Sequence, residues 1–209
     1  NEGGSPTLIN CSFLGNNATY GGAIYNSSSS PVLSNCSFQG NNVDSSGGAI
    51  YNSSSSPALS NCSFQGNNAT YGGAINNFND SSPVLNDCSF QLNDAFFGGA
   101  IYNSSSSPAL SNCSFQGNNA DSSGGAIYNF SSSSPTLTNC SFQGNNASFD
   151  GGGIYNNGGS PTLTNCSFQG NNADSSGGAI RNVYSSPTFI NCILWNNQQG
   201  ASTTAPGAS

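Results

Sequence analysis

The sequence contains very little charge and lacks several residues on which catalysis usually depends. Among 209 residues there is one basic side chain, Arg181, with eight acidic ones and no Lys, His or Met, so charged residues amount to 4% and the formal net charge is −7. Nucleic acids and anionic membranes bind basic surfaces, and we expect neither as a partner. Without His, a Ser-His-Asp catalytic triad is excluded.

Long apolar segments are also missing. No run of about 20 apolar residues and no signal peptide with a basic start is present, so we predict no membrane span. Because the chain has no Met at all, including at position 1, we expect it to be a processed product or a fragment. Export followed by removal of a leader is the simpler account, and it predicts a location outside the cell or at the cell surface.

The residues that are abundant recur at a fixed interval. A proline returns every 25 to 27 residues, and a cysteine follows each proline by five positions: Pro6, Pro31, Pro57, Pro83, Pro108, Pro135, Pro161 and Pro187. Each unit reads P-x-L-x-N-C-S-F-Q-G-N-N-A, then a short variable stretch, then G-G-A-I-Y-N and a serine run. Such a period is typical of solenoids, in which each repeat packs only on its neighbours.

Three short strand-like segments occur in each unit: Ala-Ile-Tyr, Pro-x-Leu-x and Cys-Ser-Phe-Gln, separated by turn residues. One unit of about 26 residues buries too little to fold alone, since roughly 10 kcal/mol of apolar burial opposes on the order of 40 kcal/mol of conformational entropy. We therefore predict an all-β fold, a right-handed single-stranded parallel β-helix with eight coils and three strands per coil. Residues 1–200 would form the solenoid, and residues 201–209 a small-residue tail that completes the last coil or contacts the next subunit.

Equivalent residues of stacked coils should form columns along the axis. We expect Leu33, Cys36, Phe38, Val43 and Ile50 to point inward. The structural columns that we predict contain Asn35, Asn61, Asn112, Asn139 and Asn165 at a left-handed corner, where Asp87 replaces Asn in the fourth coil; Cys36, Cys62, Cys88, Cys113 and Cys140; and Phe38, Phe64, Phe90, Phe115 and Phe142. Two further asparagine columns, which start at Asn26 and Asn16, should bond amide to amide along the axis.

The eight cysteines allow two interpretations. Disulfides are possible in an exported chain, but residues in register lie about 4.8 Å apart, wider than the roughly 3.8 Å that the Cβ atoms of a disulfide prefer. We favour a buried column of free thiols. The cysteines lie on one line and cannot surround a zinc ion. Asp80, Asp87 and Asp94 occupy different corners of a coil and would not share a metal ion. We therefore expect no metal and no cofactor.

Two motifs that recur together carry a family resemblance. Gly-Gly-Ala-Ile occurs at 21–24, 47–50, 72–75, 98–101, 124–127 and 177–180, and Phe-x-x-Asn at 13–16, 38–41 and equivalent positions. The chain resembles the repeats of polymorphic outer-membrane proteins, on a pectate-lyase-like solenoid. This resemblance implies a surface-exposed β-helical passenger involved in adhesion.

Parallel β-helices also occur in polysaccharide lyases and hydrolases. Arg181 is the only candidate base for a lyase, and it stands in a column of tyrosines formed by Tyr25, Tyr51, Tyr102, Tyr128 and Tyr155. A hydrolase needs two facing carboxylates, but Asp44, Asp121 and Asp174 belong to different coils, roughly 10 to 15 Å apart by strand spacing. We therefore predict no catalytic residues. The tyrosine column is either a structural ladder or a stripe on which sugars stack.

The function that we predict is structural: a subunit that stacks head to tail into an extracellular homopolymeric filament. The alternatives are a fragment of an autotransporter-like adhesin and, more remotely, a polysaccharide-cleaving enzyme. The expected partners are further copies of the chain and glycans of a host surface or matrix.

Overall fold

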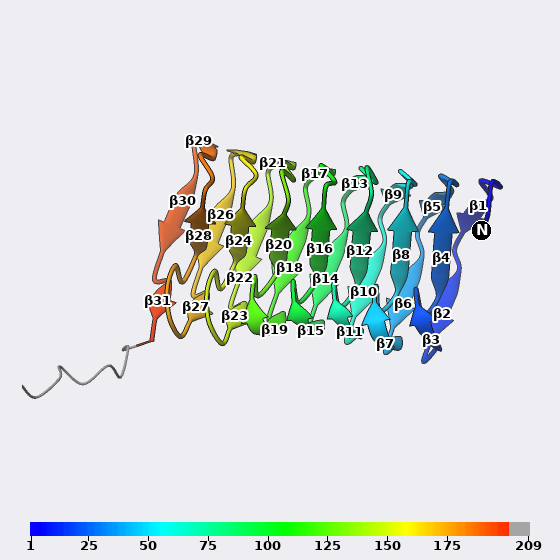
Figure 1. Ribbon diagram of the computed structural model, residues 1–209, viewed down its shortest axis with the longest axis horizontal. Helices are drawn as coiled ribbons and strands as arrows, with labels where there is room; N and C mark the ends of the chain where they lie inside the picture. Colours follow the sequence, from blue (N-terminus) through cyan, green and yellow to red (C-terminus); the bar gives the residue numbers. More distant parts are fainter. Residues whose placement is uncertain (201–209) are drawn as a thin grey trace, which may run out of the picture.

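The computed structural model describes residues 1–200 as a right-handed parallel β-solenoid in which successive coils lie side by side along the long axis (Figure 1). Every strand pair is parallel, and equivalent repeat positions face one another, as with Phe64 and Phe90. Within the described residues there is no helix, and hence none that could cross a membrane. The predicted fold class is confirmed.

Four sheets run along the axis, each built from one segment of the repeat. The leucine sheet consists of β1 (Thr7–Ile9), β5 (Val32–Ser34), β9 (Ala58–Ser60), β13 (Val84–Asn86), β17 (Ala109–Ser111), β21 (Thr136–Thr138), β25 (Thr162–Thr164) and β29 (Thr188–Ile190). The phenylalanine sheet consists of β2 (Ser12–Leu14), β6 (Ser37–Gln39), β10 (Ser63–Gln65), β14 (Ser89–Gln91), β18 (Ser114–Gln116), β22 (Ser141–Gln143), β26 (Ser167–Gln169) and β30 (Ile193–Trp195).

The other two sheets follow in each coil. The variable sheet consists of β3 (Asn17–Tyr20), β7 (Asn42–Ser46), β11 (Asn68–Tyr71), β15 (Asp94–Phe97), β19 (Asn119–Ser123), β23 (Asn146–Ala147), β27 (Asn172–Ala173) and β31 (Gln198–Gln199). The isoleucine sheet consists of β4 (Ile24–Ser27), β8 (Ile50–Ser53), β12 (Ile75–Phe78), β16 (Ile101–Ser104), β20 (Ile127–Phe130), β24 (Ile154–Asn157) and β28 (Ile180–Val183).

The prediction of three strands per coil is wrong, because the variable stretch forms a fourth. Its Asn and Asp residues disfavour strands, yet the backbone pairs with the coils on both sides; Asn68, for example, pairs with Asn42 and with Asp94. Stacking decides the conformation here, since a parallel neighbour satisfies the backbone groups of almost any sequence.

The predicted count of eight coils is slightly too high for the described residues. Three sheets have eight strands but the isoleucine sheet has seven, so seven coils are complete and an eighth is partial. The residues that we expected to complete it, Thr204 and Ala205, belong to the tail 201–209 and lie outside the described residues.

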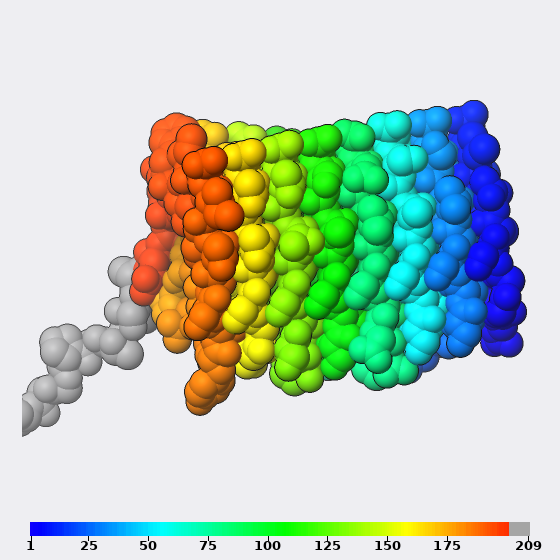
Figure 2. All heavy atoms as spheres, turned by 90° about the horizontal axis from the view of Figure 1, so that it is seen from above, coloured from blue at the N-terminus to red at the C-terminus, as the bar shows by residue number. Residues whose placement is uncertain are grey.

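The core follows the predicted inward columns. Leu33, Cys36, Phe38, Val43 and Ile50 are all at most 2% exposed. The phenylalanine rings form one parallel stack from Phe13 to Phe168 with centroids 4.5 to 4.8 Å apart. In the space-filling view the coils form successive bands along the axis (Figure 2).

The paired glycines are explained by close backbone packing before each isoleucine strand. Gly47 has a φ of +67°, which L side chains rarely adopt. Gly48 packs directly against the next coil, and a Cβ there would overlap the carbonyl oxygen of Gly73. Two consecutive positions in the coil therefore exclude a side chain for different reasons.

Candidate functional site

One continuous polar feature is a ladder formed by the asparagines of the Phe-x-x-Asn motif, Asn16, Asn41, Asn67, Asn93, Asn118, Asn145, Asn171 and Asn197. The Nδ2 of Asn67 donates to Asn93 Oδ1 at 2.9 Å and to the Phe38 carbonyl oxygen at 3.1 Å, and the backbone N–H of Asn67 donates to the same Oδ1 at 3.0 Å. The amide-to-amide bond recurs at every step from Asn16 to Asn197. The predicted bonding along the axis is confirmed.

A second ladder runs through the isoleucine sheet: Asn1, Asn26, Asn52, Asn77, Asn103, Asn129, Asn156 and Asn182, with Nδ2 to Oδ1 distances of 2.8 to 2.9 Å. Its members between Asn26 and Asn156 are at most 1% exposed. This column lies within the strands and faces inward, because the residue two positions after an inward isoleucine shares its face.

The corner asparagines adopt the predicted left-handed conformation. Asn35, Asn61, Asn112, Asn139 and Asn165 have φ between 49° and 54°, and Asp87 has a φ of 54°. Their side chains bond more loosely and at the surface, as where Asn112 Nδ2 donates to Asp87 Oδ1 at 3.1 Å. These residues shape the bend between the leucine and phenylalanine sheets.

The cysteines form a column of free thiols. Cys36, Cys62, Cys88, Cys113 and Cys140 are buried, and each sulfur lies near a backbone carbonyl oxygen, as Cys113 Sγ does at 3.3 Å from that of Ser111. Burial raises the pKa of the Cys36 thiol. The adjacent thiols of Cys113 and Cys62, followed by burial, raise the pKa of Cys88. The thiols of Cys140 and Cys88 instead lower the pKa of Cys113, so the direction of the shift alternates along the column. All five side chains are at most 1% exposed and pack as small apolar groups.

The tyrosine column lies on the outer face of the isoleucine sheet. Neighbouring rings stack, with centroids 5.3 Å apart for Tyr25 and Tyr51 and 4.8 Å apart for Tyr128 and Tyr155. Burial, followed by the neighbouring Tyr128, raises the pKa of Tyr102. Arg181 pairs with Tyr155 in register and is exposed, so it is a surface substitution within this column.

A row of aromatic residues on the variable sheet packs against this column and was missed by sequence reasoning. Tyr20 contacts Tyr51, Tyr71 contacts Tyr102, and Phe97 contacts Tyr128, with centroids 5.1 to 5.3 Å apart. The aromatic residues of the variable stretch were the available signal. Without the fourth strand, their direction could not be assigned.

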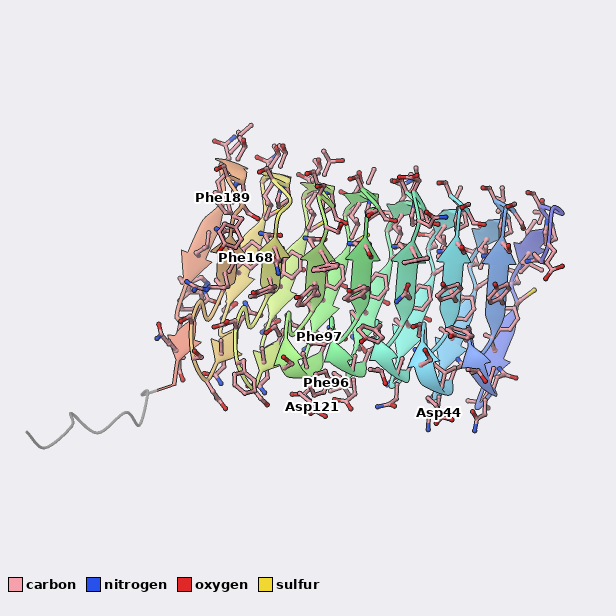
Figure 3. The ribbon with its side chains drawn as sticks, in the orientation of Figure 1. Asp44, Phe96, Phe97, Asp121, Phe168 and Phe189 are labelled. Atoms are coloured by element: carbon pink, nitrogen blue, oxygen red, sulfur yellow. The ribbon has the colours of Figure 1, made fainter. Side chains whose placement is uncertain are left out.

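The acidic residues of the variable sheet lie along one edge, and two of them share a donor: Asn119 Nδ2 donates to Asp94 Oδ1 at 2.7 Å and to Asp121 Oδ1 at 3.4 Å. Asp44 on β7 and Asp121 on β19 lie at the same edge of the solenoid but at different points along its axis (Figure 3). Asp94 lies between their coils, where its carboxylate accepts hydrogen bonds from Asn68 at 2.9 Å and from Asn119 at 2.7 Å. Within residues 1–200 no group of three or more His, Cys, Asp or Glu side chains is arranged to hold a metal ion.

These features define a repeat protein whose polar side chains mainly bond one coil to the next. The family comparison agrees: residues 1–161 match the right handed beta helix region, and the chain belongs to this family. Residues 165–183 match the Chlamydia polymorphic membrane protein repeat, in agreement with the resemblance carried by the two motifs. None of the curated proteins matches the chain.

Proposed function

We propose that the chain is a non-enzymatic, rigid segment of a surface-exposed protein, similar to the passenger of an autotransporter-like adhesin. The observation that carries this proposal is the unbroken asparagine ladder from Asn16 to Asn197. A buried amide ladder joins each coil to the next and penalises any coil that separates, because it would leave several buried polar groups unpaired. Such a rigid chain would hold other parts of a protein away from a surface. The polymorphic membrane protein repeat at 165–183 favours the cell surface as the location of the chain.

Antibody labelling of the source cells tests this location. An antibody raised against the purified chain should label intact cells, and brief protease treatment of those cells should remove the signal. An antibody against a cytoplasmic protein of the same cells should label only after permeabilisation. If the chain behaves like that cytoplasmic control, the proposal is wrong.

Head-to-tail assembly is a second candidate, for which the inward-facing residues of the last described coil offer a contact surface. Phe189 and Leu194 face the core side of the last described coil but are 43% and 48% exposed, whereas their neighbours Leu163 and Phe168 are fully buried. Phe189 lies at one end of the solenoid (Figure 3). Another coil stacked there would cover both side chains and pair the open strand edges.

Electron microscopy and sedimentation of the purified chain test assembly. Wild type should form rods with a repeat of about 38 Å, which is eight strand spacings, and Leu194→Glu should abolish them. Trp195→Glu is the matched control, since Trp195 is 54% exposed and lies on the outer face beside it. Wild-type monomers at high concentration would rule assembly out and leave the passenger proposal standing.

The enzymatic alternative has a direct assay. Because Arg181 is the only basic side chain of the sequence and is exposed beside Tyr155 on the outer face, we expect no unsaturated products when the chain is incubated with polygalacturonate. Product formation above that of a heat-denatured sample would show that the chain is a lyase.

A further inference from the structure

The tyrosine column is interrupted at one coil. In β12 the position between Tyr51 and Tyr102 is occupied by Asn76, which pairs in register with both. The two tyrosines therefore stand about two strand spacings apart, roughly 9.6 Å, whereas consecutive rings elsewhere in the column are 4.8 to 5.3 Å apart. One aromatic ring is absent from an otherwise regular stack.

The neighbouring aromatic row is interrupted at the matching place. In three other coils a ring on the variable sheet contacts the tyrosine of the following coil, as Tyr71 contacts Tyr102. For Asn76, the corresponding position on the variable sheet of the preceding coil is Ser46. Ser46 is in register with Tyr20 and with Tyr71. Both members of one aromatic pair are thus replaced by small polar residues.

A hollow of about 350 Å³ occupies this place. Its walls include the rings of Tyr51, Tyr71 and Tyr102, and its polar lining includes Asn76, Ser46 and Ser104. This volume is within the range of small-molecule sites, which combine apolar walls with a few placed polar groups.

The polar lining contains an unsatisfied acceptor. Asn76 is 3% exposed, and its Nδ2 donates to the Tyr71 carbonyl oxygen at 3.4 Å, but its Oδ1 is buried without a hydrogen-bond partner. A buried acceptor without a partner is destabilising, so a ligand donor that reached Oδ1 after a small side-chain shift would be favoured.

We propose that this hollow binds one neutral sugar ring of a glycan, stacked between Tyr51 and Tyr102, with a hydroxyl that donates to Asn76 Oδ1. The C–H faces of a sugar pack on aromatic rings, and its edge hydroxyls match Ser46, Ser104 and the amide. The net charge of −7 disfavours anionic sugars. The site goes beyond the structural role proposed above and does not depend on it.

Saturation-transfer NMR on the purified full chain tests the site, with millimolar methyl glycosides of glucose, galactose and N-acetylglucosamine as probes. Wild type should transfer saturation to the ring protons of at least one of them. Asn76→Tyr should lose binding at least tenfold, because it restores the ring found in the other coils. Thr136→Tyr, which adds the same side chain on the exposed face of β21, should bind like wild type.

A second variant distinguishes the contribution of the hydrogen-bond acceptor to binding from that of the space between the two tyrosines. Asn76→Ala keeps the space and removes the oxygen, so we expect binding weakened about fivefold, as for one hydrogen bond of about 1 kcal/mol. The proposal is overturned if wild type binds none of the three glycosides, if Asn76→Tyr binds as well as wild type, or if p-cresol displaces the sugar and binds more tightly. Surface labelling and rod formation are measured separately, so a negative result here leaves those outcomes unchanged.

Discussion

The ring of Phe64 lies parallel to the ring of Phe90, with centroids 4.8 Å apart and 4° between the planes. Both side chains are at most 1% exposed, and the same relation is repeated along the solenoid. An aromatic pair adds about 0.5 to 1.5 kcal/mol beyond the area that it buries. A ring in the middle of the stack has two such neighbours, and the phenylalanine column is therefore a main source of cohesion between coils.

Phe90→Ala should destabilise the protein by about 3 to 5 kcal/mol, because it removes a buried ring and leaves a cavity between two others. Urea unfolding followed by circular dichroism measures the change. Phe149→Ala is the control: Phe149 is 58% exposed and should change stability by less than about 0.5 kcal/mol. Equal effects of the two substitutions would contradict the importance of the stack.

Leu92→Gly should stabilise the protein by about 1 kcal/mol. Leu92 has a φ of 53° and is 63% exposed, at a corner where other coils place glycine. The left-handed conformation costs an L side chain about 1 to 2 kcal/mol, partly offset by the greater freedom of glycine in the unfolded chain. The reciprocal change Gly144→Leu, where φ is 61° and the space is open, should have the opposite sign. Melting temperatures of both variants check this, and a loss of stability in Leu92→Gly would refute it.

Asn93→Leu should cost at least about 3 kcal/mol, although the two side chains are similar in size. The substitution removes the acceptor of the Asn67 amide and backbone N–H, and the donor to Asn118 and Phe64, and each buried group left unpaired costs about 1 to 3 kcal/mol. Chemical denaturation gives the value. Asn139→Gly, at an exposed corner with a φ of 53°, serves as the comparison and should change stability little. If Asn93→Leu is as stable as wild type, the ladder contributes nothing.

All eight cysteines should carry free thiols. Maleimide labelling of the unfolded, unreduced chain followed by intact mass measurement should show eight additions. In the folded protein Cys11 and Cys192, which are half-buried, should react well before the six buried thiols between them. Each pair of missing additions that returns after reduction would reveal a disulfide and contradict the free-thiol column.

Stability should fall at alkaline pH. Burial raises the pKa of Tyr51, Tyr102, Tyr128 and Tyr155 above the ordinary value of 10.0. The unfolded chain then loses tyrosine protons at a lower pH than the folded chain, so the folded state binds more protons and ΔG of unfolding decreases as the pH rises above about 10. Melting temperatures between pH 7 and 11, together with tyrosinate absorbance, measure this. A melting temperature constant up to pH 11 would show that the tyrosine column is not protected.

The repeat by itself determined the solenoid, its inward columns and the corner conformation. Leu33, Cys36 and Phe38 could be assigned to the interior because strand residues two apart share a face and apolar side chains recur at each period. Asn35 could be assigned to a left-handed bend because asparagine tolerates that conformation. These properties are local or periodic, and a single sequence displays both.

Only the tertiary structure decided the features that depend on pairing between coils. Strands such as β7 and β15 exist because adjacent backbones satisfy their hydrogen bonds, which local preference does not reveal. The hollow beside Asn76 is decided in the same way: Ser46 and Asn76 are 30 positions apart in the printed sequence and border one space only because adjacent coils stack in register. A contact across stacked coils is set by register, and the register is established only when the coils associate.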